Sequence, residues 1–485
     1  MPSIGYAHLI ERLSLQVRPL QTPAIVSGSV NRRVDTVSQV LFPRGVAIDD
    51  SLVGHLEFAL RHEGVNLEVI DAACEHIHPL DLPRRLNAAP TGAHIRRACF
   101  LWEWLTGGDL PMDAIPSGGY VDLFPQDEYL TAEHPRNNQK FRVRDNALGT
   151  ADFCPTVRRS AVPPSPSLGE LLAEARRTLD TVSDPALYER ALSYLYLSET
   201  RGSFEIERER PSSDKQERFV QLLRRAGETT VSEDWLVSLQ HAVVRDVFSR
   251  EASYRTKQNW LEDGTGRITF FPPPPDALRR AMVGWETFVN DDQRCTDALV
   301  KAACAAFGFV YLHPFLDGNG RLHRFLIHHV LTHWAPLPGG AVLPVSAVIL
   351  KHLPEYLGVL SGFSRPVTRL WDYLRGDVEP VVTRSPGGRA YRFFDASREV
   401  AFLHRMIQLA VEDEIPRELA WLRGYDLAFQ QLEAEFDLPR KDLSALIRMI
   451  QSNQGMLSAH RRKQYFHLPA EVLERIEVIV QQAFN

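Results

Sequence analysis

The stretch HPFLDGNGRLHR, residues 313–324, lies between two strongly apolar helical patterns. The first pattern runs from Asp297 to Tyr311, and Pro314 discourages its continuation. Glycines on both sides of Asn319 let the loop adopt conformations that are closed to residues with a Cβ atom. The second pattern starts near Arg321, and its apolar residues surround most of the helix axis. The sequence therefore predicts a glycine-rich turn at the start of a central, buried helix.

The residue types in this loop suit a phosphate group. Backbone N–H groups at a helix start and in a glycine-rich loop favour anions, and Arg321 and Arg324 add planar positive charges. Asp317 offers hard oxygen ligands for Mg²⁺, and His313 can take up a proton near neutral pH. A plain helix-start loop with solvated arginines is the alternative, but it does not explain why these roles coincide. The pattern predicts a site of phosphoryl or nucleotidyl transfer, and it lacks the P-loop signature.

The chain has 485 residues and a formal net charge of −6, and its 44% of hydrophobic residues exclude global disorder. With this net charge, we expect no nucleic-acid binding through the overall electrostatic field of the chain. The basic segment AHRRKQ, residues 459–464, leaves nucleic-acid binding open for the C-terminal domain. The five scattered cysteines indicate reduced thiols, and the N-terminal residues are not typical of a signal peptide. No run of 18 apolar residues occurs, so we expect a soluble, cytoplasmic protein without a membrane span.

The length predicts roughly three domains. The Pro- and Ser-rich segment Ala161–Ser167 marks a boundary, so we assign residues 1–160 to an N-terminal accessory domain of α+β character. Residues 161–384 form the core, which is helical except for a β-hairpin whose turn signals lie at Asp263–Gly266. Residues 385–485 form a C-terminal helical domain, and the helices around its basic segment make it helix-turn-helix-like. We therefore expect a mainly α protein.

The motif matches, position by position, the signature H-x-F-x-[DE]-G-N-G-R-x-x-R of the Fic family. The hairpin GRITFFPPPPD, residues 266–276, resembles the flap that positions this family's substrate, and FVYLHPFLDGNGRLHRFLIHHVL, residues 309–331, resembles its central helix pair. The resemblance covers roughly Leu168 to Asp377. It implies the family's helical bundle with one β-hairpin.

The resemblance implies transfer of AMP from ATP to a Ser, Thr or Tyr hydroxyl of a target protein, with Mg²⁺ as cofactor. His313 would be the general base for the target hydroxyl, and Asp317 would bind Mg²⁺. Arg321 would hold the β-phosphate and Arg324 the γ-phosphate. The other nucleotide-binding residues that the resemblance implies are Leu316, Asp317, Gly318, Asn319, Gly320 and, near the adenine, Tyr356. The kinase-like branch of the family lacks the Gly-Asn-Gly-Arg run, so the intact run favours AMP transfer.

A second motif precedes the core, where residues 198–209 read SETRGSFEIERE. Members of the family that restrain their own activity carry [ST]-x-x-x-E-[GN] on a helix. Ser203 to Glu207 fit the first five positions, and Arg208 replaces the usual Gly or Asn. We expect an inhibitory helix at about residues 198–209, with Ser203 and Glu207 on one face.

The resemblance implies that Glu207 pairs with Arg324 and occupies the place of the γ-phosphate, since a carboxylate competes with phosphate for the same guanidinium. The residues alone also fit an amphipathic helix with surface glutamates. Glu205 or Glu209 could take over the role of Glu207, because Arg208 departs from the family pattern.

Two other functions remain open on the sequence. The same fold could remove AMP from a protein or transfer another nucleotide or phosphate-linked group. Alternatively, the terminal domains could recognise DNA or a partner while the core only senses nucleotide, which would make the chain a regulatory binding protein. For the transferase we expect a hydroxyl-bearing target protein as partner, with self-modification and homodimerisation left open.

Overall fold

The structure, a computed structural model, describes residues 2–112, 114–244, 247–376 and 379–484. The described chain is mainly helical with small sheets, which confirms the predicted fold class. Its contacts define two compact units. The first comprises Met1–Ser165, Glu207–Pro336 and His352–Arg405, and the second comprises Pro166–Ile206, Leu337–Lys351 and Met406–Asn485. The division into 1–160, 161–384 and 385–485 stays a prediction.

The N-terminal part of the first unit combines helices with two small sheets, as its α+β prediction requires. Its helices are α1 (Gly5–Leu13), α2 (Leu52–His62), α3 (Leu67–Cys74), α4 (Asp81–Ala88) and α5 (Ala93–Thr106). One sheet has the order β1 (Ala24–Ser27), β3 (Val40–Pro43), β2 (Val34–Asp35), and the other has the order β4 (Val121–Asp122), β6 (Val143–Asp145), β5 (Arg136–Asn138). β1 runs parallel to β3, with Ala24 opposite Val40. Leu56, Ile70 and Leu101, all fully buried, belong to the core that holds these helices together.

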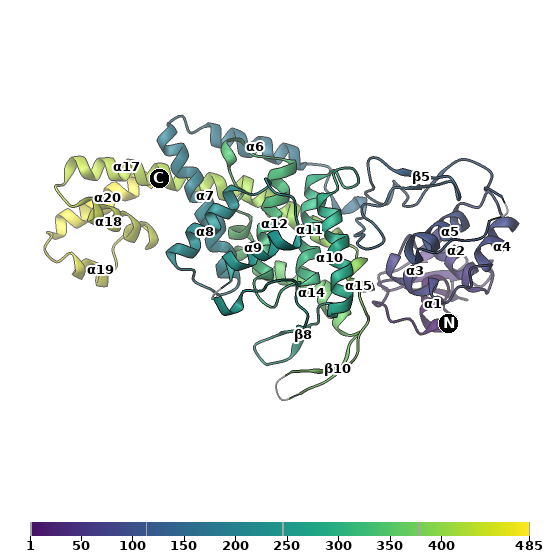
Figure 1. Cartoon of the computed structure of the whole chain (residues 1–485). Coiled ribbons are helices and arrows are strands. Elements are labelled where there is room, and N and C mark those ends of the chain that lie inside the picture. Colours follow the sequence, from purple (N-terminus) through teal and green to yellow (C-terminus); the bar gives the residue numbers. More distant parts are fainter. Residues whose placement is uncertain (1, 113, 245–246, 377–378, 485) are drawn as a thin grey trace. The chain divides into compact units, whose positions relative to one another are not determined.

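The remainder of the first unit is a helical bundle around the motif (Figure 1). Its helices are α8 (Ser213–Arg224), α9 (Glu233–Val243), α10 (Pro275–Asn290), α11 (Ala298–Leu312), α12 (Asn319–Trp334), α14 (Leu353–Thr368) and α15 (Arg389–Arg392). α11 packs along α12, and α10 covers α11. α11 begins where the Asp297 carboxylate accepts the Val300 N–H, and almost all its residues are buried, because its sequence is apolar on every face. This pair is the predicted central helix pair.

Two hairpins project from these helices (Figure 1). The predicted hairpin consists of β7 (Leu261–Glu262) and β8 (Ile268–Phe270), which pair antiparallel around a turn at Asp263. β9 (Asp372–Leu374) and β10 (Val381–Arg384) form a second hairpin that the sequence did not predict.

Buried ion pairs tie the N-terminal part to the bundle. Arg294 Nη2 lies 2.8 Å from Asp145 Oδ2, and the two side chains are 7% and 9% exposed. Asp71 Oδ2 lies 2.8 Å from Arg389 Nε and 3.1 Å from Arg392 Nη2. These contacts explain why both parts belong to one compact unit.

The second unit is helical. Its helices are α6 (Leu168–Asp180), α7 (Pro185–Ile206), α13 (Val345–Lys351), α17 (Ile415–Glu435), α18 (Arg440–Ser452), α19 (Ala459–Gln464) and α20 (Ala470–Phe484), with a π-helical turn at Ala410–Glu414. α16 (Ser397–Leu409) leads into this unit from the first. α7 approaches α13 closely at Gly202, where a Cβ atom would lie 2.6 Å from the Ala347 nitrogen. Leu446, Ile447 and Ile476 belong to a separate core beneath α17, α18 and α20.

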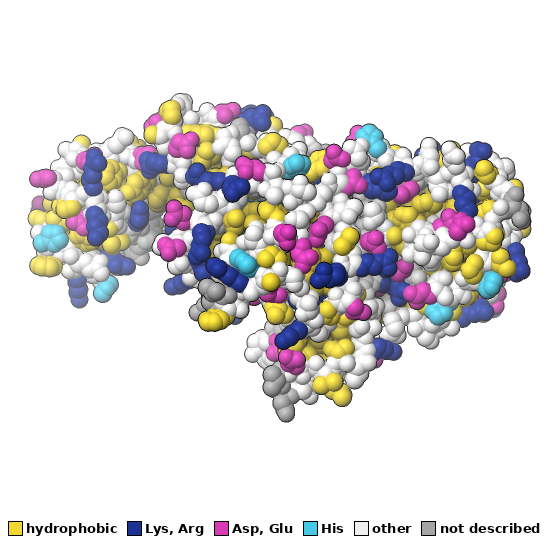
Figure 2. All heavy atoms as spheres, viewed as in Figure 1, with side chains coloured by type: hydrophobic (Ala, Val, Ile, Leu, Met, Phe, Trp, Pro, Cys, Tyr) yellow, Lys and Arg dark blue, Asp and Glu magenta, His cyan; other side chains and the backbone are white. Residues whose placement is uncertain are grey.

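Among the residues that the structure describes, no helix has both the length and the apolar character needed to cross a membrane. The five cysteines, all within the described residues, are buried and unpaired. Acidic and basic side chains are interspersed on the face shown in Figure 2, so neither charge dominates that surface.

Candidate functional site

The predicted motif forms a loop between α11 and α12. His313 ends α11 in the left-handed conformation, with φ 51° and ψ 58°, and its N–H donates to the Phe309 carbonyl at 2.8 Å. Gly318, with φ 91°, immediately precedes α12. The Asn319 side chain accepts the Phe315 N–H at 3.1 Å and donates to the Phe315 carbonyl at 2.7 Å. The loop is therefore closed by its own asparagine, and a phosphate contact of Asn319 would have to use its backbone N–H.

His313 is arranged as a base. It is 8% exposed, and its Nδ1 lies 3.2 Å from the Val310 carbonyl oxygen. Because a carbonyl only accepts, Nδ1 carries the proton and the lone pair lies on Nε2. Burial lowers the pKa of His313 to about 4, and the Arg255 charge acts in the same direction. The imidazole is therefore neutral at physiological pH and can accept a proton on Nε2.

Arg321, which is 3% exposed, lies among carboxylates. Its Nε is 2.9 Å from Glu207 Oε2, its Nη1 is 2.7 Å from Glu209 Oε2 and its Nη2 is 3.1 Å from Asp317 Oδ1. Nη1 also donates to the Val243 carbonyl at 2.5 Å. A phosphate group that binds Arg321 must therefore compete with these carboxylates.

Arg324 is 1% exposed and shares the carboxylate of Glu207 with Arg321. Its Nη2 lies 2.7 Å from Glu207 Oε1, and it forms a hydrogen bond with the side chain of Tyr356. Burial acts to lower the pKa of Arg324, but Glu207 and Tyr356 raise it above its usual value, so the guanidinium is charged. The expected contact between Glu207 and Arg324 is present, and Glu207 bridges both arginines of the motif.

The structure corrects the expected position of Glu207 on a helix. α7 ends at Ile206, so Glu207 lies after the helix and not on the same helix face as Ser203. Arg208 has a left-handed φ of 58°, which a right-handed helix cannot accommodate. Glycine and asparagine adopt this conformation at a lower cost than arginine does. Ser203 is fully buried in α7, in the second unit, and its inhibitory role stays a prediction.

The remaining predicted binding residues lie around the same loop. The Leu316 side chain is 51% exposed, and its N–H donates to the Glu251 carboxylate at 2.7 Å. A Cβ atom on Gly320 would lie 2.3 Å from Glu207 Oε1, so the glycine allows this carboxylate to approach. Tyr356 is 3% exposed and contacts Arg324. The nucleotide contacts of these residues stay predictions.

A cavity of about 560 Å³ opens beside the motif. It is lined by Glu207, Arg208, Glu209, Arg210, Ser212, Lys215, Asp317 and Arg321. Its volume falls in the range of small-molecule sites. The segment after α7 therefore forms one wall of this cavity, and Asp317 and Arg321 form another.

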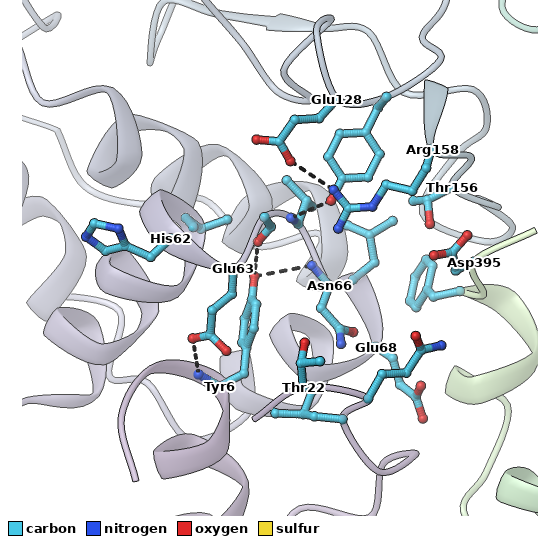
Figure 3. A pocket seen from close by; sticks show the side chains of 18 of the residues that line it. Tyr6, Thr22, His62, Glu63, Asn66, Glu68, Glu128, Thr156, Arg158 and Asp395 are labelled. Atoms are coloured by element: carbon cyan, nitrogen blue, oxygen red, sulfur yellow. Dashed lines mark hydrogen bonds and ion pairs between the residues drawn. The ribbon is translucent and has the colours of Figure 1, made fainter. Parts of the chain in front are cut away.

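A larger cavity, of about 750 Å³, lies in the first unit and is lined by no residue of the motif. Figure 3 shows Glu128 and Arg158 on one side of it and Tyr6, Glu63 and Asn66 on another. Arg158 is paired with Glu128 at 2.8 Å, and the Tyr6 N–H donates to Glu63 at 3.0 Å. Burial raises the pKa of Glu63 to about 7. Because both signs of charge line this cavity, its lining does not indicate one class of ligand.

Among the described residues, the ligand atoms of His8, Asp50 and His55 lie within 4.8 Å of one another, as a metal site would require. However, His55 Nδ1 accepts the Gly5 N–H at 3.2 Å. The proton of a neutral His55 is therefore on Nε2, which lies 3.3 Å from Asp50 Oδ1. This arrangement leaves His55 without a lone pair for a metal.

The sequence analysis missed residues that contact the motif from outside it. The Glu251 carboxylate binds the Leu316 N–H at 2.7 Å, and Arg255 Nε donates to the His313 carbonyl at 2.8 Å. Their segment has no motif and little regular structure, so no local pattern could have identified them. They approach the loop only through the tertiary fold.

Comparison with known proteins matches the part of the chain that contains the motif. Residues 230–331 match the model of the Fic/DOC family. The curated relatives, of which three are described below, are named protein adenylyltransferase Fic. The protein from Nematostella vectensis is 28% identical over 104 residues, which cover 21% of this chain and 23% of the relative. The one from Aedes aegypti is 31% identical over 116 residues, which cover 23% of this chain and 19% of the relative. The one from Drosophila melanogaster is 39% identical over 61 residues, which cover 12% of this chain and 12% of the relative.

The matched part of the chain thus spans less than a quarter of the length of these relatives. Among solved structures, a Fic family protein from Desulfovibrio desulfuricans has a TM-score of 0.38 and 18% identity, covering 64% of this chain and 86% of that one. A Fic domain containing signaling protein from Bacteroides thetaiotaomicron has a TM-score of 0.37 and 16% identity, and the match covers 52% of this chain and 97% of that one. Residues 230–331 of this chain form a Fic/DOC domain.

Proposed function

We propose that the chain is a protein adenylyltransferase, which transfers AMP from ATP to a Ser, Thr or Tyr hydroxyl of a target protein. The observation that carries this proposal is the complete motif, in which a neutral base at His313 and the buried Arg321 and Arg324 belong to one loop and the helix it opens. The name of the curated relatives supports the same class of reaction.

In this reaction, Nε2 of His313 takes the proton of the target hydroxyl while its oxygen attacks the α-phosphorus of ATP. The bond between the α-phosphorus and the oxygen of the β-phosphate breaks, and pyrophosphate leaves. The helix start at Asn319 and Gly320 offers N–H groups to the phosphates. Arg321 and Arg324 neutralise the charge on the β- and γ-phosphates. No residue of the chain needs to become covalently modified.

Asp317 fits the role of Mg²⁺ ligand. Its side chain is 46% exposed and lines the 560 Å³ cavity, and its contacts with the Gly318 N–H and Arg321 both use Oδ1. Mg²⁺ commonly binds one or two carboxylates together with phosphate oxygens and water. When bound, the ion would supply neutralisation of phosphate charge.

We also propose that Glu207 restrains the enzyme. Its carboxylate bridges Arg321 and Arg324, which would otherwise hold the β- and γ-phosphates. ATP could then enter only with its phosphates displaced, and its α-phosphorus would be poorly aligned for attack. Misplacement by about 1 Å can lower a rate on the order of a hundredfold.

Incubation with ATP labelled at the α-phosphate tests the proposal. Label that becomes covalently attached to any protein supports AMP transfer, and label on the chain itself would indicate self-modification. Tight ATP binding without covalent label would support the nucleotide sensor instead. Release of label from an already modified protein would support removal of AMP. A γ-labelled ATP control excludes phosphate transfer.

Identification of labelled proteins in a lysate of the source cells would name the target. We place the reaction in the cytoplasm because reduced cysteines are typical of that compartment. Sedimentation of the purified chain would show whether it forms a homodimer. The membrane and nucleic acid are not expected partners of the transferase.

A further inference from the structure

The segment from Glu251 to Asn259 runs beside the motif loop and contacts its backbone. Glu251 accepts the Leu316 N–H at 2.7 Å, and the Arg255 N–H donates to the Pro314 carbonyl at 2.8 Å. Arg255 also reaches the His313 carbonyl with its side chain. Successive polar groups of the loop that carries the base are thus fixed by one neighbouring segment.

Arg255 is the centre of these contacts. It is 4% exposed, and its guanidinium donates to the carbonyls of His313 (2.8 Å), Pro273 (2.6 Å) and Lys257 (3.0 Å). In the part of the chain that the structure describes, no carboxylate oxygen lies within 4.0 Å of its nitrogens. Burial lowers the pKa of Arg255 to about 10, so it is still charged at neutral pH. A buried cation is normally paired with an acid, whereas carbonyl dipoles compensate this one.

One of the carbonyls that Arg255 binds belongs to His313, whose backbone conformation is strained. His313 has φ 51°, a conformation that is unfavourable for a residue with a Cβ atom by about 1–2 kcal/mol. The direction of its imidazole follows from that backbone. Pro273, the second carbonyl partner, lies in the proline run through which the β7–β8 hairpin returns to α10. One guanidinium therefore fixes the base and the exit of the hairpin at the same time.

We propose that Arg255 is a positioning residue for AMP transfer, which holds His313 and the β7–β8 hairpin at a fixed separation so that base and target hydroxyl meet. The proposal rests on the proposed function of the chain. Its chemistry requires arginine, because the planar guanidinium can donate in several fixed directions at once. A lysine ammonium would keep the charge but could not reproduce this geometry.

The rate of transfer tests this role in a Glu207→Gly background, where the proposed restraint is absent. Arg255→Met should lower kcat on the order of a hundredfold, as expected for a misplacement of about 1 Å. Arg255→Lys should lower kcat less. The KM for ATP should change little in both, because Arg255 does not contact Arg321 or Arg324. Arg279→Met is the matched control, since that side chain is 64% exposed, and it should leave kcat unchanged.

A second readout does not require AMP transfer. The pKa of the His313 imidazole is measured by NMR on labelled histidines, and the signal absent from His313→Ala identifies it. Arg255 and Asp317 are the charged groups that act on this ring, and Phe270 of β8 also packs against it. Loss of the Arg255 charge should raise the pKa of His313 in Arg255→Met, whereas Arg255→Lys should leave it nearly unchanged.

The outcomes separate the two proposals. If no variant transfers AMP but the pKa of His313 rises in Arg255→Met, the proposed function fails while the contact of Arg255 with the base stands. If kcat falls only in proportion to the folded fraction, and the pKa of His313 does not move, Arg255 is merely structural and the proposal is overturned. If Arg255→Met does not fold, Arg255→Lys decides, and a normal kcat in that variant also overturns it.

Discussion

At the residue scale, the imidazole of His313 is the group on which the proposed reaction depends most directly. Its neutral state and proton-accepting Nε2 follow from burial and from the Val310 carbonyl. We expect His313→Ala to abolish AMP transfer while ATP affinity stays within about tenfold, because the arginines and the helix start remain. Label transfer and calorimetric ATP binding measure the two effects. Near-normal turnover would remove His313 from the mechanism.

The pH dependence should report the same side chain. Burial lowers the pKa of His313 from an ordinary 6.5 to about 4, so its neutral, active form persists as the pH falls. The transfer rate should therefore be nearly constant from pH 8 to about 5.5 and decline only as the pH approaches 4. An ordinary histidine would already have lost about nine-tenths of the rate at pH 5.5. Such an early decline, with the fold intact by circular dichroism, would contradict the assignment.

Arg208 determines how the chain leaves α7. Its φ of 58° is left-handed, and an arginine in this conformation is less stable than a glycine would be by about 1–2 kcal/mol. We expect Arg208→Gly to stabilise the turn that presents Glu207, and to lower the basal transfer rate by about fivefold, the factor that corresponds to 1 kcal/mol. Arg208→Gln keeps the Cβ atom and separates the effect of charge from that of conformation. A rate that rises in Arg208→Gly would show that this turn does not support the restraint.

At the element scale, the segment after α7 forms one wall of the 560 Å³ cavity beside the motif. Glu207 contacts both arginines, whereas Glu209 contacts Arg321 and is also paired with Lys215 at 3.2 Å. We expect Glu207→Gly to raise the rate of α-phosphate label transfer by at least about tenfold, because the phosphates can then align. Adding Arg324→Ala should cancel that gain.

Single variants of the neighbouring glutamates complete this test. Glu209→Gln should raise the rate less than Glu207→Gly, because it removes a carboxylate from Arg321 but leaves Glu207 in contact with both arginines. Glu205→Ala is the control, because Glu205 is exposed on α7. If Glu207→Gly is no faster than the unaltered chain while Glu209→Gln is faster, Glu209 is the restraint. If neither is faster, another segment restrains the enzyme or none does.

At the scale of the whole molecule, the N-terminal part and the Fic/DOC domain share one compact unit. The pair of Asp145 and Arg294 crosses between them with side chains 9% and 7% exposed. Asp145→Ala leaves a buried arginine without its acid, which should lower the free energy of unfolding by about 3–5 kcal/mol. Calorimetry should show this as a lower Tm for the transition that unfolds both parts. Asp35→Ala, which removes an exposed pair with Arg33, should have little effect.

Melting of the Asp145→Ala variant also tests whether the N-terminal part and the Fic/DOC domain unfold as one unit or as two independent domains. If the two parts melt separately, and Asp145→Ala shifts neither transition, the N-terminal part is only loosely attached. The predicted boundary at residue 160 would then describe an independent domain. A common shift would instead show that the accessory part stabilises the bundle that carries the motif.

The sequence by itself determined the local features. The motif, the mainly α fold class, the helices on either side of residues 313–324 and the hairpin with its turn at Asp263 all follow from residue types and spacings close in the chain. The contact of Glu207 with Arg324 could be predicted only because the motif resembles a known pattern. Such predictions succeed because glycine, proline and apolar periodicity act over a few residues.

Only the tertiary structure decided which distant groups surround the motif. Arg255 and Glu251 have no local signal, since they act through contacts with residues far away in the chain. The end of α7 at Ile206 also depends on the left-handed Arg208, a conformation that glycine or asparagine would have signalled and arginine did not. The pKa of His313 is set by burial, which no local pattern encodes because the burying residues come from separate elements.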